Sequence, residues 1–315
     1  MQYRQLGKTS LQVSVLGFGA SPLGDEFGAI DPRDGQRAVD AAIDHGITYF
    51  DVAPYYGRTL AETRLGTFLK GKRHQIILAT KAGRYDRHLP DGFDFSAEGI
   101  TRSVEGSLRR LQTDVIDVFQ AHDVEFGKRE VILHETLPAL HRLKEQGKIR
   151  YTGITGYPLG FLKSMAEASD VDVVLSYCHY TLLDTTLDAV LRPLARARGI
   201  GLINASPLHM GMLTQAGAPP WHPAPRAVQK KTRSAAQWCA DRGVDLAALA
   251  LQFALDYEHA ATTLVGMRRP EEVIRNVQAV GTPPDSGLLA AVRTILRPVL
   301  DRSWPSGLPE NNQGA

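Results

Sequence analysis

The chain repeats one pattern along most of its length: a short apolar run the length of a β-strand is followed by a longer amphipathic stretch the length of a helix. Strands that alternate with helices pair in parallel, because each strand needs a crossover to return to the same end of the sheet. The expected strands lie at residues 13–17, 47–51, 76–81, 115–121, 149–154, 171–176, 201–205 and 263–265. Eight such repeats predict an α/β fold, a closed (β/α)8 TIM barrel. The helix-length stretches include residues 33–45, 96–111, 129–146, 184–198 and 229–242.

Three segments depart from this repeat. Residues 3–13 are predicted as a β-hairpin around Gly7 and Lys8, which caps the floor of the barrel. The proline-rich insert 215–226 is expected to lie over the pocket, and residues 303–315 are expected to form a flexible tail or a second flap on the same rim. Because no linker or shift in composition separates these segments, residues 1–315 are interpreted as a single domain.

The overall composition excludes several classes of protein. A net charge of +2 over 315 residues gives no field that would gather nucleic acid or a membrane surface, so neither is expected as a partner. The N-terminal residues lack the basic and apolar regions of a signal peptide. Two cysteines, Cys178 and Cys239, do not make a secreted disulfide framework, so a cytoplasmic location is expected. The composition does not predict an oligomeric state.

Polar residues stand where three of the predicted strands end. Asp51, Lys81 and His122 close successive apolar runs, and Tyr56 lies five residues beyond Asp51. Catalytic groups of such barrels gather at the C-terminal ends of the strands. A phenol has a pKa near 10, and Lys81, held by Asp51, is expected to lower the pKa of Tyr56. With His122 orienting a substrate oxygen, the four residues predict a proton-transfer site for alcohol oxidation or carbonyl reduction.

Each of these residues also has a structural explanation when taken alone. Asp51 could cap the following turn, Lys81 could be a surface residue, and His122 could be a hydrogen-bonded structural histidine. Their coincidence at strand ends favours a site. Other chemistries lack their motifs: no Gly-x-Gly-x-x-Gly or P-loop is present, and His134-Glu135 lacks the second histidine of a zinc helix, so no metal site is predicted.

With these residues in hand, residues 3–280 resemble the aldo-keto reductase family. The stretches that carry the resemblance are GFGASPLG at 17–24, FDVAPYYG at 50–57, ATKAGRY at 79–85, LSYCHY at 175–180 and ASPL at 205–208. The resemblance implies that Asp51, Tyr56, Lys81 and His122 form the catalytic tetrad of a nicotinamide-dependent oxidoreductase. It implies cofactor contacts to the nicotinamide ribose at Ala20 and Ser21, to the carboxamide at Thr155 and Gly156, and to the pyrophosphate at Ser206, Leu208 and Gly211. It implies contacts to the adenosine end at Gly266, Met267, Arg268, Glu272 and Asn276, and further contacts at Asp51 and, by stacking, at Tyr177.

The resemblance is strongest to family members that oxidise L-galactose, L-fucose and similar aldoses at the anomeric carbon. It therefore implies a small sugar substrate and a lactone product. The candidate substrate contacts are His122, at the substrate oxygen, and Tyr55, His179 and Trp221, each of which could equally be a packing residue. Glu272 stands where NADP-dependent relatives carry an arginine, so NAD is favoured and NADP stays possible. The alternatives are a broad carbonyl reductase or pyridoxal-type dehydrogenase of the same family, or a non-catalytic, cofactor-binding regulatory subunit.

Overall fold

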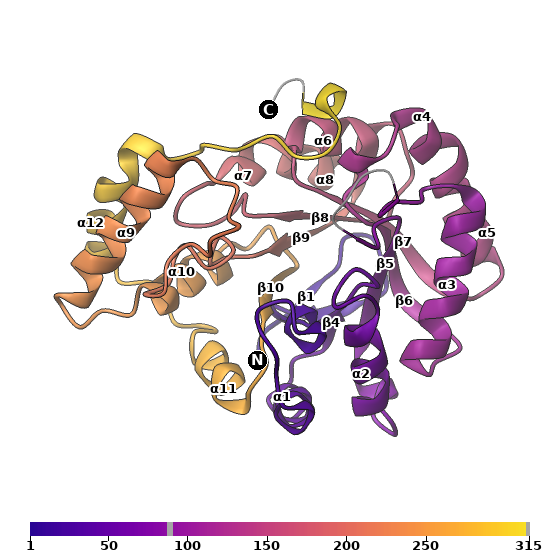
Figure 1. Cartoon of the computed structure of the whole chain (residues 1–315), viewed down its shortest axis with the longest axis horizontal. Coiled ribbons are helices and arrows are strands. Elements are labelled where there is room, and N and C mark those ends of the chain that lie inside the picture. The colour runs from indigo at the N-terminus through magenta and orange to yellow at the C-terminus, as the bar shows by residue number, and fades with distance from the viewer. Residues whose placement is uncertain (87–90, 313–315) are drawn as a thin grey trace.

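The computed structural model describes residues 1–86 and 91–312, and it contains the predicted barrel (Figure 1). Eight parallel strands close on themselves in the order β10, β3, β4, β5, β6, β7, β8, β9. These strands are β3 Leu16–Gly19, β4 Tyr49–Asp51, β5 Ile77–Ala82, β6 Ile116–Ala121, β7 Ile149–Gly156, β8 Val173–Tyr177, β9 Gly201–Ala205 and β10 Thr262–Gly266. All eight predicted strands are therefore present.

Helices surround the barrel (Figure 1). They are α1 Pro32–Asp44, α2 Leu60–Phe68, α3 Ala97–Leu111, α4 Arg129–Val131, α5 Leu137–Glu145, α6 Leu159–Glu167, α7 Thr186–Val190, α8 Arg192–Arg198, α9 Arg226–Ala240, α10 Leu246–Leu255, α11 Pro270–Gln278 and α12 Ser286–Leu296. Two predicted helices, 129–146 and 184–198, are each interrupted ahead of a proline: a π-helical stretch, Ile132–Thr136, precedes Pro138, and Leu191 separates α7 from α8 before Pro193. Proline has no N–H to donate to the preceding turn, so the regular α-helical ladder is interrupted there.

The N-terminal hairpin closes the barrel floor, as predicted. Its strands, β1 Tyr3–Gln5 and β2 Gln12–Ser14, pair antiparallel. The prediction placed Val13 in the first barrel strand, but Val13 pairs with β1, and the barrel strand begins only at Leu16. Leu6, Leu11 and Val13 are buried among apolar residues of the barrel interior. Their burial makes the hairpin part of the core at the end opposite the strand-end site.

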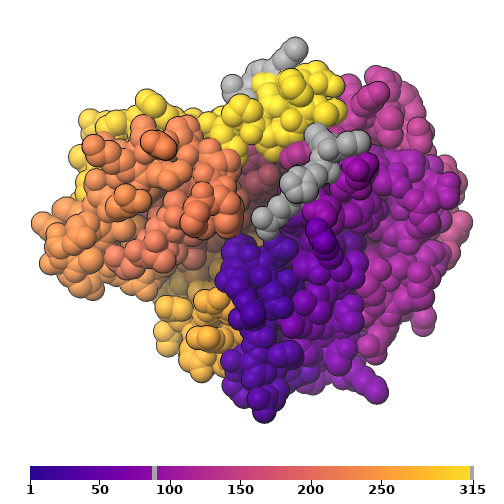
Figure 2. All heavy atoms as spheres, viewed as in Figure 1, coloured from indigo at the N-terminus to yellow at the C-terminus, as the bar shows by residue number. Residues whose placement is uncertain are grey.

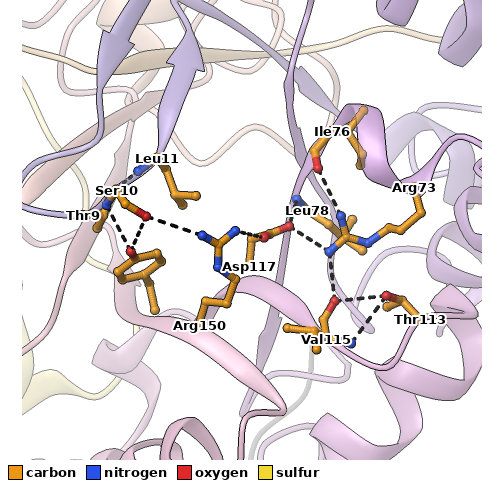
Figure 3. Close-up of polar contacts among 11 residues, drawn as sticks. Thr9, Ser10, Leu11, Arg73, Ile76, Leu78, Thr113, Val115, Asp117 and Arg150 are labelled. Atoms are coloured by element: carbon orange, nitrogen blue, oxygen red, sulfur yellow. Dashed lines mark hydrogen bonds and ion pairs between the residues drawn. The ribbon is translucent and has the colours of Figure 1, made fainter.

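A buried carboxylate ties the hairpin turn to the lower ends of the strands (Figure 3). Asp117 of β6 accepts hydrogen bonds from Arg73 and Arg150, each at 2.7 Å. Arg150 also reaches the Ser10 hydroxyl at 3.4 Å, and the Ser10 backbone N–H donates to the Tyr151 hydroxyl at 3.0 Å. The two guanidinium groups satisfy the carboxylate that the strand buries.

Asp117→Asn is expected to destabilise the protein by about 2–3 kcal/mol. The amide would turn donor atoms toward guanidinium groups that are themselves donors, and the buried backbone N–H of Leu78, now 2.9 Å from Asp117 Oδ2, could lose its acceptor. The effect stays below that of a fully buried pair because Arg150 is partly exposed. Urea denaturation at constant m measures the change, with the exposed Asp114→Asn as control. Equal losses in both variants would contradict this role.

The C-terminal segment is not a flexible tail over the residues that the structure describes. Residues 303–312 lie across the rim, where Figure 2 shows the yellow segment running from the side of α12 to the side of α6. Trp304 is buried and its ring stacks on Tyr157 at a centroid distance of 4.4 Å. Asn311 is also buried and donates to two backbone carbonyls. Apolar burial and these hydrogen bonds outweigh the sequence signals for fraying; residues 313–315 lie outside the described part of the chain.

The proline-rich insert lies within the connection between β9 and α9. Its Trp221 is half exposed and contacts Phe27, at a centroid distance of 6.5 Å, in the loop after β3. The insert therefore reaches past β10, the strand between β9 and β3, to the loop after the first barrel strand. Among the helices that the structure describes, none is both long and apolar enough to cross a membrane.

Candidate active site

The four tetrad residues meet at the C-terminal ends of the strands. Asp51 is the last residue of β4, Lys81 lies near the end of β5, and His122 directly follows β6. The Lys81 ammonium donates to the Asp51 carboxylate, to the Val52 carbonyl at 3.0 Å and to the Tyr56 hydroxyl at 3.4 Å. These acceptors use all three protons of the ammonium, so its position is fixed.

Two glycines bring Tyr56 to this position. An added Cβ at Gly24 would lie 2.6 Å from the Tyr56 backbone, and one at Gly57 would lie 2.3 Å from the Gly24 carbonyl oxygen. Gly57 also has a φ of +61°, in the left-handed region. The loop after β4 can therefore lie directly against the short helix Ser21–Gly24, and this contact turns the Tyr56 side chain toward Lys81.

Gln120 supports the ion pair from below. Its side-chain amide donates to Asp51 Oδ2 at 3.3 Å, while Lys81 binds Asp51 Oδ1. Burial raises the pKa of Asp51, and Lys81 and Gln120 oppose that shift. Burial alone would lower the pKa of Lys81, but Asp51 and Tyr56 raise it, so the ammonium stays charged. Sequence reasoning missed Gln120, although its place two residues before His122 on β6 points it into the same barrel interior.

The pKa of Tyr56 is not lowered, as the sequence had suggested, but raised to about 12. Burial is the main cause; Lys81 lowers the value, but the carboxylates of Asp51 and Asp123 raise it again. A cation already paired with a carboxylate has little net field left to stabilise a phenolate. Tyr56 therefore holds its proton at neutral pH, which suits it to donate a proton to a substrate oxygen.

His122 is neutral at physiological pH. Burial lowers its pKa to about 3, and the positive charges of Lys81 and Arg84 add to that effect against Asp123. Its Nε2 lies 3.8 Å from Asp123, and its ring is packed edge to face against Tyr56 at a centroid distance of 6.0 Å. A neutral imidazole in this place can hydrogen-bond to a substrate oxygen without taking up a charge.

Asp123 and Arg84 form a second polar group beside the tetrad, which sequence reasoning missed. Arg84 donates to the Asp123 carboxylate, and its guanidinium lies over the Tyr55 ring at 4.2 Å from the centroid. Asp123 has a φ of +52°, a conformation that costs energy for a residue with a side chain. The only sequence signal for Asp123 is its position directly after His122. Its backbone strain and its pairing with Arg84 depend on the folded structure.

The predicted cofactor residues lie on several strand ends around this site. Gly266 of β10 is paired with Gly19 of β3, and an added Cβ at Gly266 would lie 3.9 Å from the Ser21 hydroxyl. The Ala20 N–H donates to the Asp51 carbonyl at 2.8 Å. The first two predicted contacts, Ala20 and Ser21, therefore adjoin both the tetrad and the predicted adenosine end.

The Thr155 hydroxyl is already engaged within the protein. It accepts from the Asp123 N–H at 2.9 Å and donates to the Asp123 carboxylate at 3.1 Å. At Gly156, an added Cβ would lie 2.8 Å from Glu125 Oε2. These two positions therefore brace the His122 loop in this structure, and their predicted carboxamide contacts stay predictions.

Two features of the remaining residues fit a nicotinamide cofactor. Tyr177, at the end of β8, presents a half-buried aromatic ring of the kind that stacks on a flat heterocycle. The loop that contains Ser206, Leu208 and Gly211 has left-handed φ values at Ser206, His209, Met210 and Gly211. Left-handed residues can turn backbone N–H groups toward an anion such as a pyrophosphate. In this loop the His209 and Gly211 N–H groups donate to the Ser206 and Leu208 carbonyls, at 2.8 and 3.1 Å, so the pyrophosphate contact stays a prediction.

At the predicted adenosine end, Glu272 holds Arg268. Its carboxylate accepts from the Arg268 backbone N–H at 2.9 Å and from the Arg268 guanidinium Nε at 3.2 Å. Met267, next to Arg268 in the chain, is fully buried, and Asn276 lies one turn after Glu272 along α11. A phosphate at this place would have to compete with the Glu272 carboxylate for Arg268.

The predicted substrate contacts other than His122 lie in three different places. Tyr55 lies in the site, with its ring 6.0 Å from that of His122. His179 is buried elsewhere, hydrogen-bonded to the Ser176 hydroxyl at 3.0 Å and packed on Tyr157 at 4.5 Å. Trp221 lies on the insert described above, and the roles of His179 and Trp221 toward a substrate stay predictions. Across residues 1–86 and 91–312, no cluster of side chains suited to a metal ion is found.

Comparison with known proteins agrees with this geometry. Residues 15–296 match the model of the aldo/keto reductase family. The chain is 44% identical to L-galactose dehydrogenase of Arabidopsis thaliana, covering 99% of each chain, and 30% identical to D-threo-aldose 1-dehydrogenase of a Pseudomonas species, covering 91% and 96%. The structure superposes on aldo-keto reductase AKR11C1 from Bacillus halodurans (holo form) with a TM-score of 0.79, 30% identity and coverage of 99% and 100%. The chain belongs to the aldo/keto reductase family of oxidoreductases.

Proposed function

We propose that the protein is an NAD-dependent aldose 1-dehydrogenase that oxidises the anomeric carbon of L-galactose, L-fucose or a similar sugar to the lactone. One observation carries the proposal: the tetrad is assembled around Lys81 in a chain that matches an L-galactose dehydrogenase over 99% of both lengths. The Asp123–Arg84 pair beside His122 supports a sugar, because a carboxylate and a guanidinium offer acceptors and donors to several hydroxyl groups.

The residues of the site can carry the proton steps of this reaction. A nicotinamide cofactor, when bound, accepts the hydride that leaves the anomeric carbon. Ser206, Leu208 and Gly211 would hold its pyrophosphate, and Tyr177 would cover its ring. The Tyr56 oxygen takes the hydroxyl proton during oxidation and returns it during reduction, while neutral His122 orients the substrate oxygen. Because the pKa of Tyr56 is about 12, the phenolate needed for oxidation increases as the pH rises.

A panel of substrates with both cofactors tests the proposal. The purified protein is mixed with L-galactose, L-fucose or D-arabinose and with NAD or NADP, and the absorbance of the reduced cofactor is followed. We expect at least one aldose to reduce the cofactor, and mass spectrometry should then detect the lactone formed from that aldose. Reduction of cofactor by none of the aldoses would reject the sugar. Oxidation of pyridoxal with NAD or NADP, or reduction of a simple aldehyde with the reduced cofactor, would instead identify one of the alternative functions.

Glu272→Arg is expected to shift the ratio of kcat/KM for NADP over NAD upward by at least tenfold, on the order of 1.4 kcal/mol. The substitution removes the carboxylate that pairs with Arg268 and adds a second cation where the resemblance places the 2′-phosphate. Steady-state kinetics with both cofactors measure the ratio.

The matched control is Glu271→Arg, an exposed position in the same helical turn with the same change of charge. A general electrostatic effect would shift the ratio equally in both variants, whereas a specific contact shifts it only at Glu272. A wild-type protein that already prefers NADP would contradict the assignment of NAD.

A further inference from the structure

A fully buried carboxyl group lies three residues after His122. The Glu125 side chain has no exposed surface, and its Oε1 accepts from the Tyr157 N–H at 3.2 Å and from the Ser306 hydroxyl at 2.9 Å. Its Oε2 has no hydrogen-bond partner within the described residues. A carboxylate in such surroundings would be an unpaired buried charge, which is costly. The tetrad chemistry gives Glu125 no part.

Glu125 is also the main attachment point of the C-terminal segment. Its backbone carbonyl accepts from the Leu308 N–H at 2.9 Å and from the Asn311 amide at 2.8 Å. Gly307 packs so closely on it that an added Cβ would lie 2.2 Å from the Glu125 carbonyl oxygen. Residues 303–312, the strap, are thus held by the backbone and by the side chain of one residue.

The strap acts on the loop that carries the catalytic imidazole. Residues 122–127 form a compact turn in which the Phe126 N–H donates to the Asp123 carbonyl at 3.0 Å, while the Asp123 N–H is held by Thr155. Asn311 closes the far end of this turn by donating to the Gly127 carbonyl at 3.0 Å. Movement of the strap would therefore shift the loop that carries His122 and Asp123.

Burial and the Asp123 carboxylate favour the neutral form of Glu125, whereas the hydrogen bonds from Ser306 and Tyr157 oppose that shift without cancelling it. Burial, and then the Asp123 carboxylate on its own loop, raise its pKa to about 8. Tyr177, at the end of β8, is a neutral phenol within electrostatic range, because burial raises its own pKa. Tyr157 offers a backbone N–H, and Glu310 on the strap is exposed to solvent. The Arg84 guanidinium, which reaches this loop from the end of β5, donates to the Asp123 carboxylate.

We propose that Glu125 is a positioning residue that, with its proton retained, fastens residues 303–312 to the loop carrying His122 and so holds the catalytic imidazole in place. Loss of that proton leaves a negative charge beside Asp123 with only two donors, and the strap then loosens. The inference goes beyond the proposed function, since the strap is held whichever carbonyl compound the site accepts.

The sign of the pH dependence follows from linkage. The unfolded chain releases the Glu125 proton near the ordinary glutamate pKa of about 4.3, whereas the folded chain keeps it up to about 8. Because the folded state binds a proton that the unfolded state has lost, this residue makes stability fall as the pH rises between those values. Glutamine copies the neutral carboxyl group and removes that dependence.

Glu125→Gln tests the proposal in the full-length protein. We expect its Tm to equal that of the wild type near pH 5 and to exceed it increasingly up to pH 8 or 9. Hydrogen exchange of the strap should quicken at least tenfold in the wild type between pH 7 and 9, after correction for intrinsic rates, and should not do so in the variant. The exposed Glu310→Gln is the control. A Tm difference independent of pH, or a strap equally protected at both pH values in the wild type, would overturn the proposal.

Glu125→Leu and Ser306→Ala separate positioning from folding alone. Both loosen the side-chain link, so kcat should fall about tenfold at pH 7 with cofactor affinity unchanged, whereas Glu125→Gln should keep kcat and extend it to higher pH. Equal pH profiles for Glu125→Gln and the wild type would overturn the positioning role. The stability and exchange measurements need no substrate, so failure of the sugar assignment would leave them valid.

Discussion

Tyr56→Phe is expected to lower kcat by about 10³-fold, near the middle of the range for a lost general acid–base group. Phenylalanine keeps the aromatic packing against Tyr55 and His122 but has no proton to exchange with the substrate oxygen. Because Lys81 retains its contacts with Asp51 and Val52, the ion pair below the ring should survive. Cofactor affinity should therefore stay within about twofold in a fluorescence titration.

Tyr151→Phe is the matched control for this prediction. Its hydroxyl accepts a hydrogen bond from Ser10 at the barrel floor, far from the strand ends that carry the tetrad. Loss of that hydroxyl should change stability slightly and leave kcat unchanged. Turnover of Tyr56→Phe within tenfold of the wild type would exclude Tyr56 as the proton carrier, and an equal loss in Tyr151→Phe would point to a general effect on folding.

The barrel could be predicted because its signals are local and periodic. Each strand reads as an apolar run, and parallel topology then requires the ends of β4, β5 and β6 to meet, which brings Asp51, Lys81 and His122 together. The prolines that interrupt two helices are also visible in the sequence. The amphipathic pattern continues on both sides of each proline, so each segment was predicted as one helix. Val13 was misplaced because a buried hairpin residue and a barrel residue are equally apolar.

The finer properties of the site depend on contacts between distant residues. Lys81 was expected to make Tyr56 more acidic, but burial and two carboxylates, one of them Asp123, reverse the sign. Glu125 is hydrogen-bonded by Ser306, 181 positions further along the chain. Sequence separation of this size leaves no periodic signal, so the strap was interpreted as a tail. The charge of a side chain can be predicted from its residue type, whereas the effect of burial on its pKa can be assessed only from the packed structure.

Lys81→Met is expected to reduce kcat at least a hundredfold and to destabilise the fold by about 3–5 kcal/mol. Lys81 is the group that lowers the pKa of Tyr56, so its loss makes proton removal from the phenol harder still. The methionine fills similar space, but Asp51 keeps only Gln120 as a partner and becomes an unpaired buried charge. Denaturant unfolding and steady-state kinetics measure the two effects separately.

The double variant Lys81→Met/Asp51→Asn distinguishes catalysis from stability. It removes both charges at once, and the carbonyl oxygen of the new amide can still accept the hydrogen bond from Gln120, so about half of the lost stability should return. Turnover should not return, because no cation remains beside Tyr56 to oppose the effect of burial on its pKa. If the double variant regained turnover together with stability, Lys81 would be needed only to neutralise Asp51. An active, stable double variant would therefore show that groups of the site other than Lys81 set the acidity of Tyr56.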